Sequence, residues 1–415
     1  MPKKSIERLK ELLREYKTFI RNTSWTALNQ IVVVVLSVLL SVIFARFTSK
    51  ELYGNYNFLT SIVTMVSIIA IPGLNTSMLR SISRGMDGVY VKAVKLSFLW
   101  SMLGVPILFL VGSYYYLFNN AHIGLGLFVA AIIFPLIYAP NNWIALLQGK
   151  KRFDTFAKYS IIQTCIRTTI IITVILLENT NLILIFLAFM LSTALTNLFF
   201  YYRSKRFVEN DDEEEGWEKS GYKLTLNDFV TLSYDNVDKI LIGIFLGPVE
   251  LAIYAIAVSI VSAIKASVIQ IIKVIYPSIF TLKRKTLAHK LRKALPFLVI
   301  SNLVLLVLTI VCLPFIMQLF YSEKYASSII FAQLYSFTIP LAVFLGVLST
   351  SLIALKKENA LLSSRIIGFI LVIILYAIFI PLWRINGAIL TSIIYYISLC
   401  ILQFYCLQSS FKHSD

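Results

Sequence analysis

The sequence predicts an all-α integral membrane protein with twelve transmembrane helices in two parallel-repeat lobes of six helices each. Its 415 residues are 58% hydrophobic and 14% charged, with a mean hydropathy of +0.80, whereas about a quarter of the residues in soluble domains are charged. Apolar runs of about 20 residues recur along the chain, and each is long enough to cross the hydrocarbon core as a helix. The two halves contain equal numbers of these runs.

The first 24 residues form an amphipathic pattern. Over MPKKSIERLKELLREYKTF, the residues Ile6, Leu9, Leu12, Leu13 and Tyr16 share one face of a helix, and basic groups occupy the other. A helix of this kind lies in the membrane interface. No small-residue cleavage pattern follows the first apolar run. We therefore expect a surface anchor on the inner leaflet and no cleaved signal peptide.

The transmembrane helices follow from the apolar runs and from the residues that interrupt them. The expected spans are 25–45, 58–79, 96–117, 123–146, 159–177, 182–202, 226–246, 250–272, 297–319, 329–354, 364–382 and 386–407. An even number of spans places both termini on one side. Of the 38 Lys and Arg residues, 31 lie in the termini and the even-numbered loops, and 4 in the odd-numbered loops. The positive-inside bias therefore places both termini in the cytoplasm.

The domain organisation follows from the acidic run ENDDEEEGWE, which separates six spans from six and is expected to be a solvated linker. The expected parts are a cytoplasmic amphipathic segment (1–24), a first six-helix lobe (25–205), a cytoplasmic acidic linker (206–223), a second six-helix lobe (224–408) and a cytoplasmic tail (409–415). A shift of 198 residues aligns FTSKELYGNYNFLTSIV with FLGPVELAIYAIAVSIV without a gap. Two copies of six helices share one orientation, and a transport pathway is expected between them.

Charged residues inside the expected spans mark a candidate site. A charge at a helix centre costs about 2.5 to 3.5 kcal/mol on insertion scales, so such residues face a bundle interior, a water-filled cavity or an ion pair. A rise of 1.5 Å per residue places Asp235, Lys265 and Arg167 about 10 to 13 Å from the cytoplasmic ends of three helices. Asp235, Asp238 and Lys239 share one helical face, and Asp235 and Lys239 are spaced to pair.

We expect these groups to line a cationic, hydrated substrate cavity. Its candidate residues are Arg167, Lys265, Lys239, Asn29, Gln30 and Gln163, and the candidates for ion coupling or charge balance are Asp235 and Asp238. The alternative is a set of buried ion pairs that lock helices together. Tyrosine pairs such as Tyr395-Tyr396 are expected in the interfacial belts, with stacking on sugar rings as the alternative.

Other kinds of chemistry lack the residues that they need. The sequence has no Walker-type glycine loop, and its three histidines are far apart, so we expect no direct use of ATP, no metal and no cofactor. The four cysteines all lie in apolar runs and are expected to be packed thiols. The net charge of +17 comes from basic residues placed as the positive-inside bias predicts, so no nucleic-acid partner is expected. No catalytic layer is evident, and we do not expect an enzyme.

Two stretches resemble polysaccharide-biosynthesis flippases. ARFTSKELYGNYNFLTSIVTMVSIIAIPGLNTSMLRSISR is similar to the family's opening signature, and Arg46 and Arg80 match the arginines of that motif. YDNVDKILIGIFLGPVELAIYAIAVSI and the following Tyr276-Pro277-Ser278 are similar to the family's seventh and eighth helices. The chain most resembles Wzx-type O-antigen or capsule repeat-unit flippases of the MOP superfamily, which have a MATE-like fold. It departs from the family at Ser49-Lys50, where the usual loop has Gly-Pro.

The resemblance implies a cargo and partners. The cargo would be an undecaprenyl-diphosphate-linked oligosaccharide, moved from the inner to the outer leaflet of the bacterial cytoplasmic (inner) membrane by alternating access. Membrane lipid would hold the prenyl tail, and H⁺ or Na⁺ is the candidate coupling ion. A polymerase and a chain-length regulator of glycan assembly are further candidate partners.

Two alternatives remain open. One is a MATE-like multidrug or cation antiporter, and the other is a non-transporting membrane subunit or enzyme of glycan assembly. An antiporter favours an acidic, aromatic cavity, whereas Arg167 and Lys265 favour an anionic cargo.

Overall fold

Helices make up most of the part of the chain that the structure describes. The computed structural model describes residues 2–177, 180–273, 284–321, 323–355 and 357–412, and no strand occurs among them. The predicted all-α class is therefore confirmed. The family-like Tyr276-Pro277-Ser278 lies outside the described residues.

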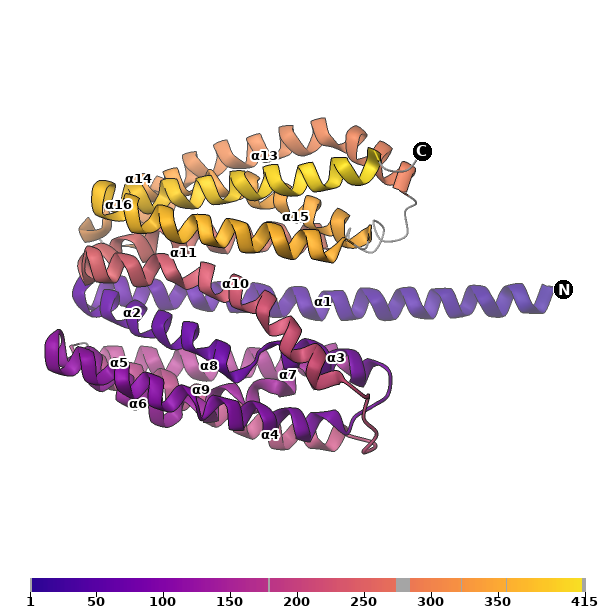
Figure 1. Ribbon diagram of the computed structural model, residues 1–415, viewed down its shortest axis with the longest axis horizontal. Coiled ribbons are helices and arrows are strands. Elements are labelled where there is room, and N and C mark those ends of the chain that lie inside the picture. The colour runs from indigo at the N-terminus through magenta and orange to yellow at the C-terminus, as the bar shows by residue number, and fades with distance from the viewer. Residues whose placement is uncertain (1, 178–179, 274–283, 322, 356, 413–415) are drawn as a thin grey trace. The chain divides into compact units, whose positions relative to one another are not determined.

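The helices follow one another along the chain with short connections (Figure 1). They are α1 (Pro2–Phe47), α2 (Lys50–Val66), η1 (Ser67–Ala70), α3 (Gly73–Ser83), α4 (Val89–Ser101), α5 (Gly104–Phe118), α6 (Ala121–Tyr138), η2 (Pro140–Asn142), α7 (Trp143–Gly149), α8 (Phe153–Leu177), α9 (Leu182–Ser204), η3 (Lys205–Phe207), α10 (Trp217–Phe245), α11 (Pro248–Lys273), α13 (Arg284–Phe320), η4 (Glu323–Tyr325), α14 (Ser328–Tyr335), α15 (Thr338–Ala354) and α16 (Glu358–Lys412).

Within the described ranges, nine helices are long and apolar enough to cross a membrane. There are ten if the bent pair Lys50–Ala70 and Gly73–Ser83, which meet at 50°, forms one span. All twelve predicted spans fall on helices, but α16 covers the last two and is interrupted at Arg384, where φ is 52° and ψ is −134°. The charged helix α10 is not among the nine. The chain is thus a multi-pass membrane protein, and the predicted count of twelve is consistent with its helices.

The amphipathic N-terminal segment and the first span form one helix, α1, unbroken from Pro2 to Phe47. The sequence contains no Gly or Pro between residues 3 and 47 that would end or kink this helix. A segment continuous with a straight span cannot also lie in the plane of the membrane. The expected separate surface helix is therefore not seen.

Contacts between Cα atoms divide the chain into two compact units. Unit 1 comprises Met1–Ser37, Val66–Val174 and Ile183–Leu226, and unit 2 comprises Val38–Met65, Ile175–Leu182 and Asn227–Asp415. Two helices, α1 and α10, therefore contribute residues to both units. The chain also passes from unit 2 to unit 1 at Val66, next to the bend between α2 and α3.

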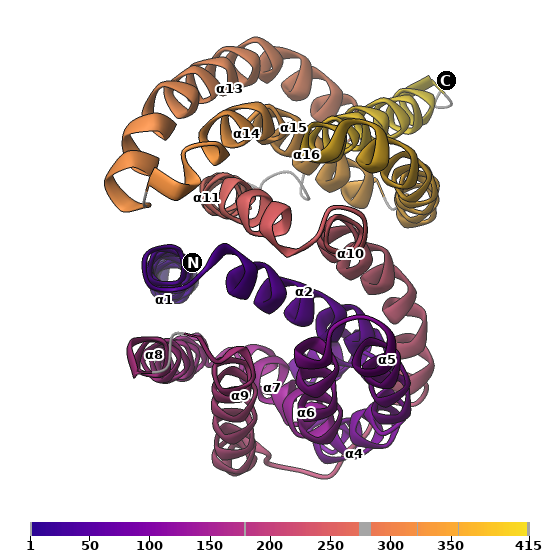
Figure 2. The same cartoon turned by 90° about the vertical axis from the view of Figure 1, so that its left-hand side faces the viewer.

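Unit 1 has a core in which α3, α4 and α7 meet the beginning of α10. Its buried residues include Leu74, Met78, Tyr90, Leu146 and Trp217. In the same unit α5 and α6 run antiparallel and pack along their lengths (Figures 1 and 2). This core places Trp217, the first residue of α10, among residues that precede it by more than 60 positions.

Unit 2 is built around α11, which is buried almost continuously from Leu251 to Val261 and contacts α14 and α15. Helix α2 packs against the start of α11 through Gly54, because a Cβ atom on Gly54 would lie 1.8 Å from the carbonyl oxygen of Pro248. Only glycine permits so close an approach. The two family-like stretches therefore meet at this point. Helices α2 and α11 begin at Lys50 and Pro248, which are separated by the offset of the predicted repeat.

Candidate functional site

Asp238 on α10 lies inside unit 2 and is only 6% exposed. Its Oδ2 accepts a hydrogen bond from the Tyr254 hydroxyl of α11 at 2.6 Å, and its Oδ1 accepts one from the backbone N–H of Lys239 at 2.7 Å. Hydrogen bonds to an ionised acceptor are roughly twice as strong as neutral ones. Both carboxylate oxygens are therefore occupied, and Asp238 fastens α10 to α11.

Asp235 lies one turn before Lys239 on the same face of α10. The Lys239 Nζ donates to the backbone carbonyl oxygen of Asp235 at 3.0 Å. None of the ion pairs found among the described residues joins the two side chains. Lys239 therefore makes a hydrogen bond to the Asp235 backbone instead of the side-chain ion pair that their spacing predicts. The Asp235 side chain is exposed, unlike that of Asp238.

Lys265 on α11 is half-buried, and aromatic side chains surround its ammonium group. Nζ donates to the Tyr396 hydroxyl at 3.1 Å and lies 5.1 Å and 5.3 Å from the ring centroids of Tyr396 and Tyr335. A cation over a ring is stabilised by about 0.5 to 2 kcal/mol. In the described part of unit 2, no carboxylate lies within ion-pair distance of Lys265. Its positive charge is thus held by aromatic rings and a hydroxyl group without a direct ion pair.

Five tyrosines from four helices join the two charged groups, and we call them the tyrosine cluster: Tyr234, Tyr254, Tyr335, Tyr395 and Tyr396. Tyr254 and Tyr335 have ring centroids 6.5 Å apart, and Tyr234 stacks on Tyr395 at 3.9 Å. Tyr234 also meets the edge of Tyr396 at 6.0 Å. Tyr395 and Tyr396 are therefore buried within unit 2, and their interfacial location stays a prediction. Tyr254 is not among the predicted site residues, although it lies on the next helix, 16 positions after Asp238.

Gln163, a predicted cavity residue on α8, is held in a hydrogen-bond network of unit 1. Its Nε2 donates to Thr196 Oγ1 at 3.0 Å and to Asn197 Oδ1 at 2.6 Å. Asn197 Oδ1 also accepts from the indole N–H of Trp143 at 3.1 Å, and its Nδ2 donates to the Ile137 carbonyl at 2.9 Å. Gln163 therefore ties α8 to α9 and to the helix that contains Trp143.

The other predicted polar residues of unit 1 lie on α1 and α8. Asn29 is 8% exposed, and its Oδ1 has no hydrogen-bond partner. Its neighbour Gln30 is half-buried. The Arg167 guanidinium lies 5.9 Å from the ring centroid of Phe189 on α9. Since Arg167 belongs to unit 1 and Lys265 to unit 2, their convergence on one cavity stays a prediction.

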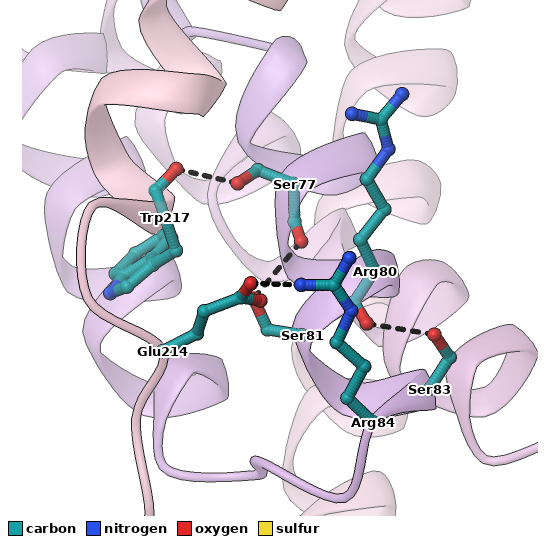
Figure 3. A network of polar contacts seen from close by, with 7 residues as sticks. All are labelled: Ser77, Arg80, Ser81, Ser83, Arg84, Glu214 and Trp217. Atoms are coloured by element: carbon teal, nitrogen blue, oxygen red, sulfur yellow. Dashed lines mark hydrogen bonds and ion pairs between the residues drawn. The ribbon is translucent and has the colours of Figure 1, made fainter.

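The two arginines of the family motif differ in their surroundings. Arg46 donates from Nε to the Phe320 carbonyl at 2.8 Å and from Nη2 to the Leu319 carbonyl at 2.7 Å. These carbonyls belong to the last turn of α13, which has no helical partner for them. Arg80 on α3 is exposed, and its side chain points away from the neighbouring Glu214 (Figure 3). Arg46 therefore has a structural role as a helix cap.

A cavity of about 350 Å³ lies between the end of α13 and α14. Its lining residues are Met317, Gln318, Tyr321, Glu323, Tyr325, Ala326 and Ile329. None of the predicted site residues is among them. This cavity is therefore distinct from the tyrosine cluster.

Comparison with protein families and with known proteins gives a consistent result. A family model described as "Polysaccharide biosynthesis protein" matches residues 19–283, which is more than half of the chain. A search of curated proteins found no match.

Solved structures of membrane transporters have similar folds. An inward-facing multidrug resistance transporter of the MATE family aligns with a TM-score of 0.69 and 14% identity, covering 94% of this chain and 100% of that one. A MOP superfamily transporter from Pyrococcus furiosus aligns with a TM-score of 0.66, 13% identity and coverage of 94% and 95%. The lipid II flippase MurJ aligns with a TM-score of 0.59, 15% identity and coverage of 95% and 89%. At these identities the likeness establishes the fold.

Proposed function

Because the chain belongs to the polysaccharide biosynthesis protein family and has the fold of MOP superfamily transporters, we propose that it is a flippase for undecaprenyl-diphosphate-linked oligosaccharide repeat units. The units move from the inner to the outer leaflet by alternating access, and the prenyl tail stays in the lipid. The proposed membrane is the bacterial cytoplasmic membrane, with both termini inside. The product is an O-antigen of lipopolysaccharide, a capsule or a related surface glycan.

The observation that carries this proposal is the ammonium group of Lys265 in the tyrosine cluster. One of its donors is used by Tyr396, and no carboxylate forms a direct ion pair with it within the described residues of unit 2. A positive charge held by aromatic rings favours an anionic group such as a diphosphate, and the rings offer apolar faces to sugars. Asp238 directs its oxygens to the Tyr254 hydroxyl and the Lys239 backbone N–H, and no ion pair joins it to Lys265 among the described residues.

The test replaces Lys265 in a strain whose own copy of the gene is deleted. We expect the deletion to abolish surface-glycan display and to cause lipid-linked intermediates to accumulate on the inner leaflet. Lys265→Met should reduce display at least tenfold, because it removes the charge and keeps the length of the side chain. Lys219→Met, at an exposed position of α10, is the matched control and should display normally.

The assay separates the proposal from its alternatives. Normal glycan display in the deletion strain, together with sensitivity to cationic drugs, would show an antiporter. The exposed Asp235 beside aromatic residues is the feature that favours this second candidate. Loss of display with no inner-leaflet intermediates would indicate a non-transporting subunit or enzyme that acts earlier in glycan assembly.

A further inference from the structure

The segment between α9 and α10 is attached to unit 1 by side chains along its whole length. The acidic composition of ENDDEEEGWE predicts a solvated linker. In the structure, residues 208–216 instead run against the connection between α3 and α4 and against the end of α7. All these residues belong to unit 1. The linker is therefore docked on unit 1, while most of its acidic side chains are exposed to solvent.

The first attachment contains a fully buried carboxylate. Asp87 has no exposed surface, and its Oδ2 lies 2.5 Å from Lys150 Nζ and accepts from the backbone N–H of Glu209 at 2.8 Å. Glu209 Oε2 lies 3.0 Å from the same Lys150 Nζ. Burial alone would lower the pKa of Lys150, but hydrogen bonds to Asp87 and Glu209 raise it above the ordinary lysine value. Lys150 therefore stays protonated and provides the counter-ion of the buried Asp87 carboxylate.

Asn210 and the backbone extend this attachment. The Asn210 Oδ1 accepts from the backbone N–H of Asp87 at 3.0 Å, and its Nδ2 donates to the Gly85 carbonyl at 2.8 Å. The Gly88 N–H donates to the Asp212 carbonyl at 2.9 Å. The linker backbone is thus fixed in register against the turn between α3 and α4.

The second attachment joins the linker to α3 just before α10 begins (Figure 3). The Glu214 carboxylate accepts from Ser81 Oγ at 2.8 Å and forms an ion pair with Arg84. Three residues later, the Trp217 carbonyl accepts from Ser77 Oγ at 2.5 Å, and the Trp217 indole lies in the core of unit 1. The start of α10 is therefore attached to α3.

The attachments differ in strength. The Arg84 and Lys92 side chains are 62% and 60% exposed, and their ion pairs with Glu214 and Glu213 contribute little, as exposed pairs do. The pair Asp87 and Lys150 is 0% and 15% exposed, and separating it strands a buried charge. The buried pair therefore dominates, and the exposed pairs align the rest of the segment.

We propose that residues 208–217 form an ionic latch that locks the start of α10 onto unit 1. The latch converts an acidic loop into a rigid connection, so α10 cannot turn freely at its first residue. Bending of α10 during transport is then confined to the part beyond Thr225, whose hydroxyl accepts from the Gly73 N–H at 3.1 Å. The role in transport rests on the proposed function, whereas the attachment itself does not.

Hydrogen exchange of the full-length protein in lipid nanodiscs tests the attachment directly. The amides of Asp87, Gly88 and Glu209, which donate across the attachment, should exchange at least tenfold more slowly in the wild type than in Lys150→Met. Asn210→Ala, which strands no buried charge, should also speed this exchange and keeps the test usable if Lys150→Met fails to fold. Glu215→Gln is the matched control, because Glu215 is exposed and makes none of the ion pairs found among the described residues. Wild-type exchange as fast as that of an unstructured peptide would overturn the latch.

Surface-glycan display of the same variants tests the role in transport. Asn210→Ala should reduce display severalfold at an unchanged protein level. The double variant Arg84→Glu/Glu214→Arg, which swaps the two charges, should display more glycan than Glu214→Arg alone. Faster exchange with full display in Asn210→Ala would reject the transport role. If deletion of the whole gene leaves display unchanged, the proposed function fails, and the exchange experiment still decides the latch.

Discussion

Among the described residues only two charged side chains are buried, and they are stabilised differently. Asp87 is held by the ammonium group of Lys150, whereas Asp238 is held by a phenol and a backbone N–H. An ion pair concentrates the stabilisation of a buried carboxylate in one partner. Removing that partner is therefore more damaging than removing any exposed charge of this chain.

Lys150→Met should lower the free energy of unfolding by about 3 to 5 kcal/mol, because it leaves the Asp87 carboxylate buried without a counter-ion. Thermal unfolding of the purified protein in detergent measures the effect. Lys151→Met is the matched control, since Lys151 is the exposed neighbour. Equal melting temperatures for the two variants would contradict the role given to Lys150.

Asp235 and Asp238 on α10 should respond differently to neutralisation. Asp235→Asn should make glycan transport insensitive to the imposed H⁺ or Na⁺ gradient, because Asp235 is the exposed carboxylate of the face that carries Lys239. Asp238→Asn should mainly reduce stability, since it weakens the bond to Tyr254. Transport by inverted membrane vesicles at varied gradients checks this. Wild-type gradient dependence in both variants would exclude coupling through Asp235 and Asp238.

At the scale of the helices, the sequence predicts most of what depends on hydrophobicity and little of what depends on distant partners. Every predicted span falls on helical segments, although several spans are broken into two or three helices, because a run of apolar residues is itself the signal. The docking of Glu209 could not be predicted, since its partners Asp87 and Lys150 lie 122 and 59 positions away. Two adjacent residues such as Tyr395 and Tyr396 do not show the helical spacing that indicates a buried face. Their burial inside unit 2 could therefore not be predicted either.

Gly54→Ala should destabilise unit 2, because the added Cβ atom would collide with the Pro248 carbonyl, a backbone atom that cannot rotate away. Overpacking typically costs about 1 to 3 kcal/mol, and the contact with backbone places this variant at the upper end. Asn55→Ala, one position further along α2, is the control. The yield and melting temperature of the folded protein in detergent are the measurements. A Gly54→Ala melting temperature equal to that of Asn55→Ala would show that α2 shifts freely along α11.

At the scale of the whole chain, the boundary between the two compact units does not lie at the acidic linker. Composition changes most sharply there, which is why the sequence predicts lobes that end at 205 and resume at 224. Contacts instead assign α10 to unit 1 up to Leu226, and they divide α1 at Ser37. A continuous helix can belong to two compact units, and no local pattern of residues marks the change. The predicted lobe boundaries therefore stay predictions.

The distribution of basic residues makes a prediction for the orientation of the entire chain. Alkaline phosphatase, which is active only after export, should be inactive when fused after Glu215 and active when fused after Asn119, which follows α5. Green fluorescent protein at the same positions should give the opposite pattern. The physical reason is that the inner leaflet and the membrane potential retain Lys and Arg, and 31 of the 38 are expected on the side of residue 215. Phosphatase activity after Glu215 would reverse the topology and place the latch, and with it Asp87 and Lys150, outside the cell.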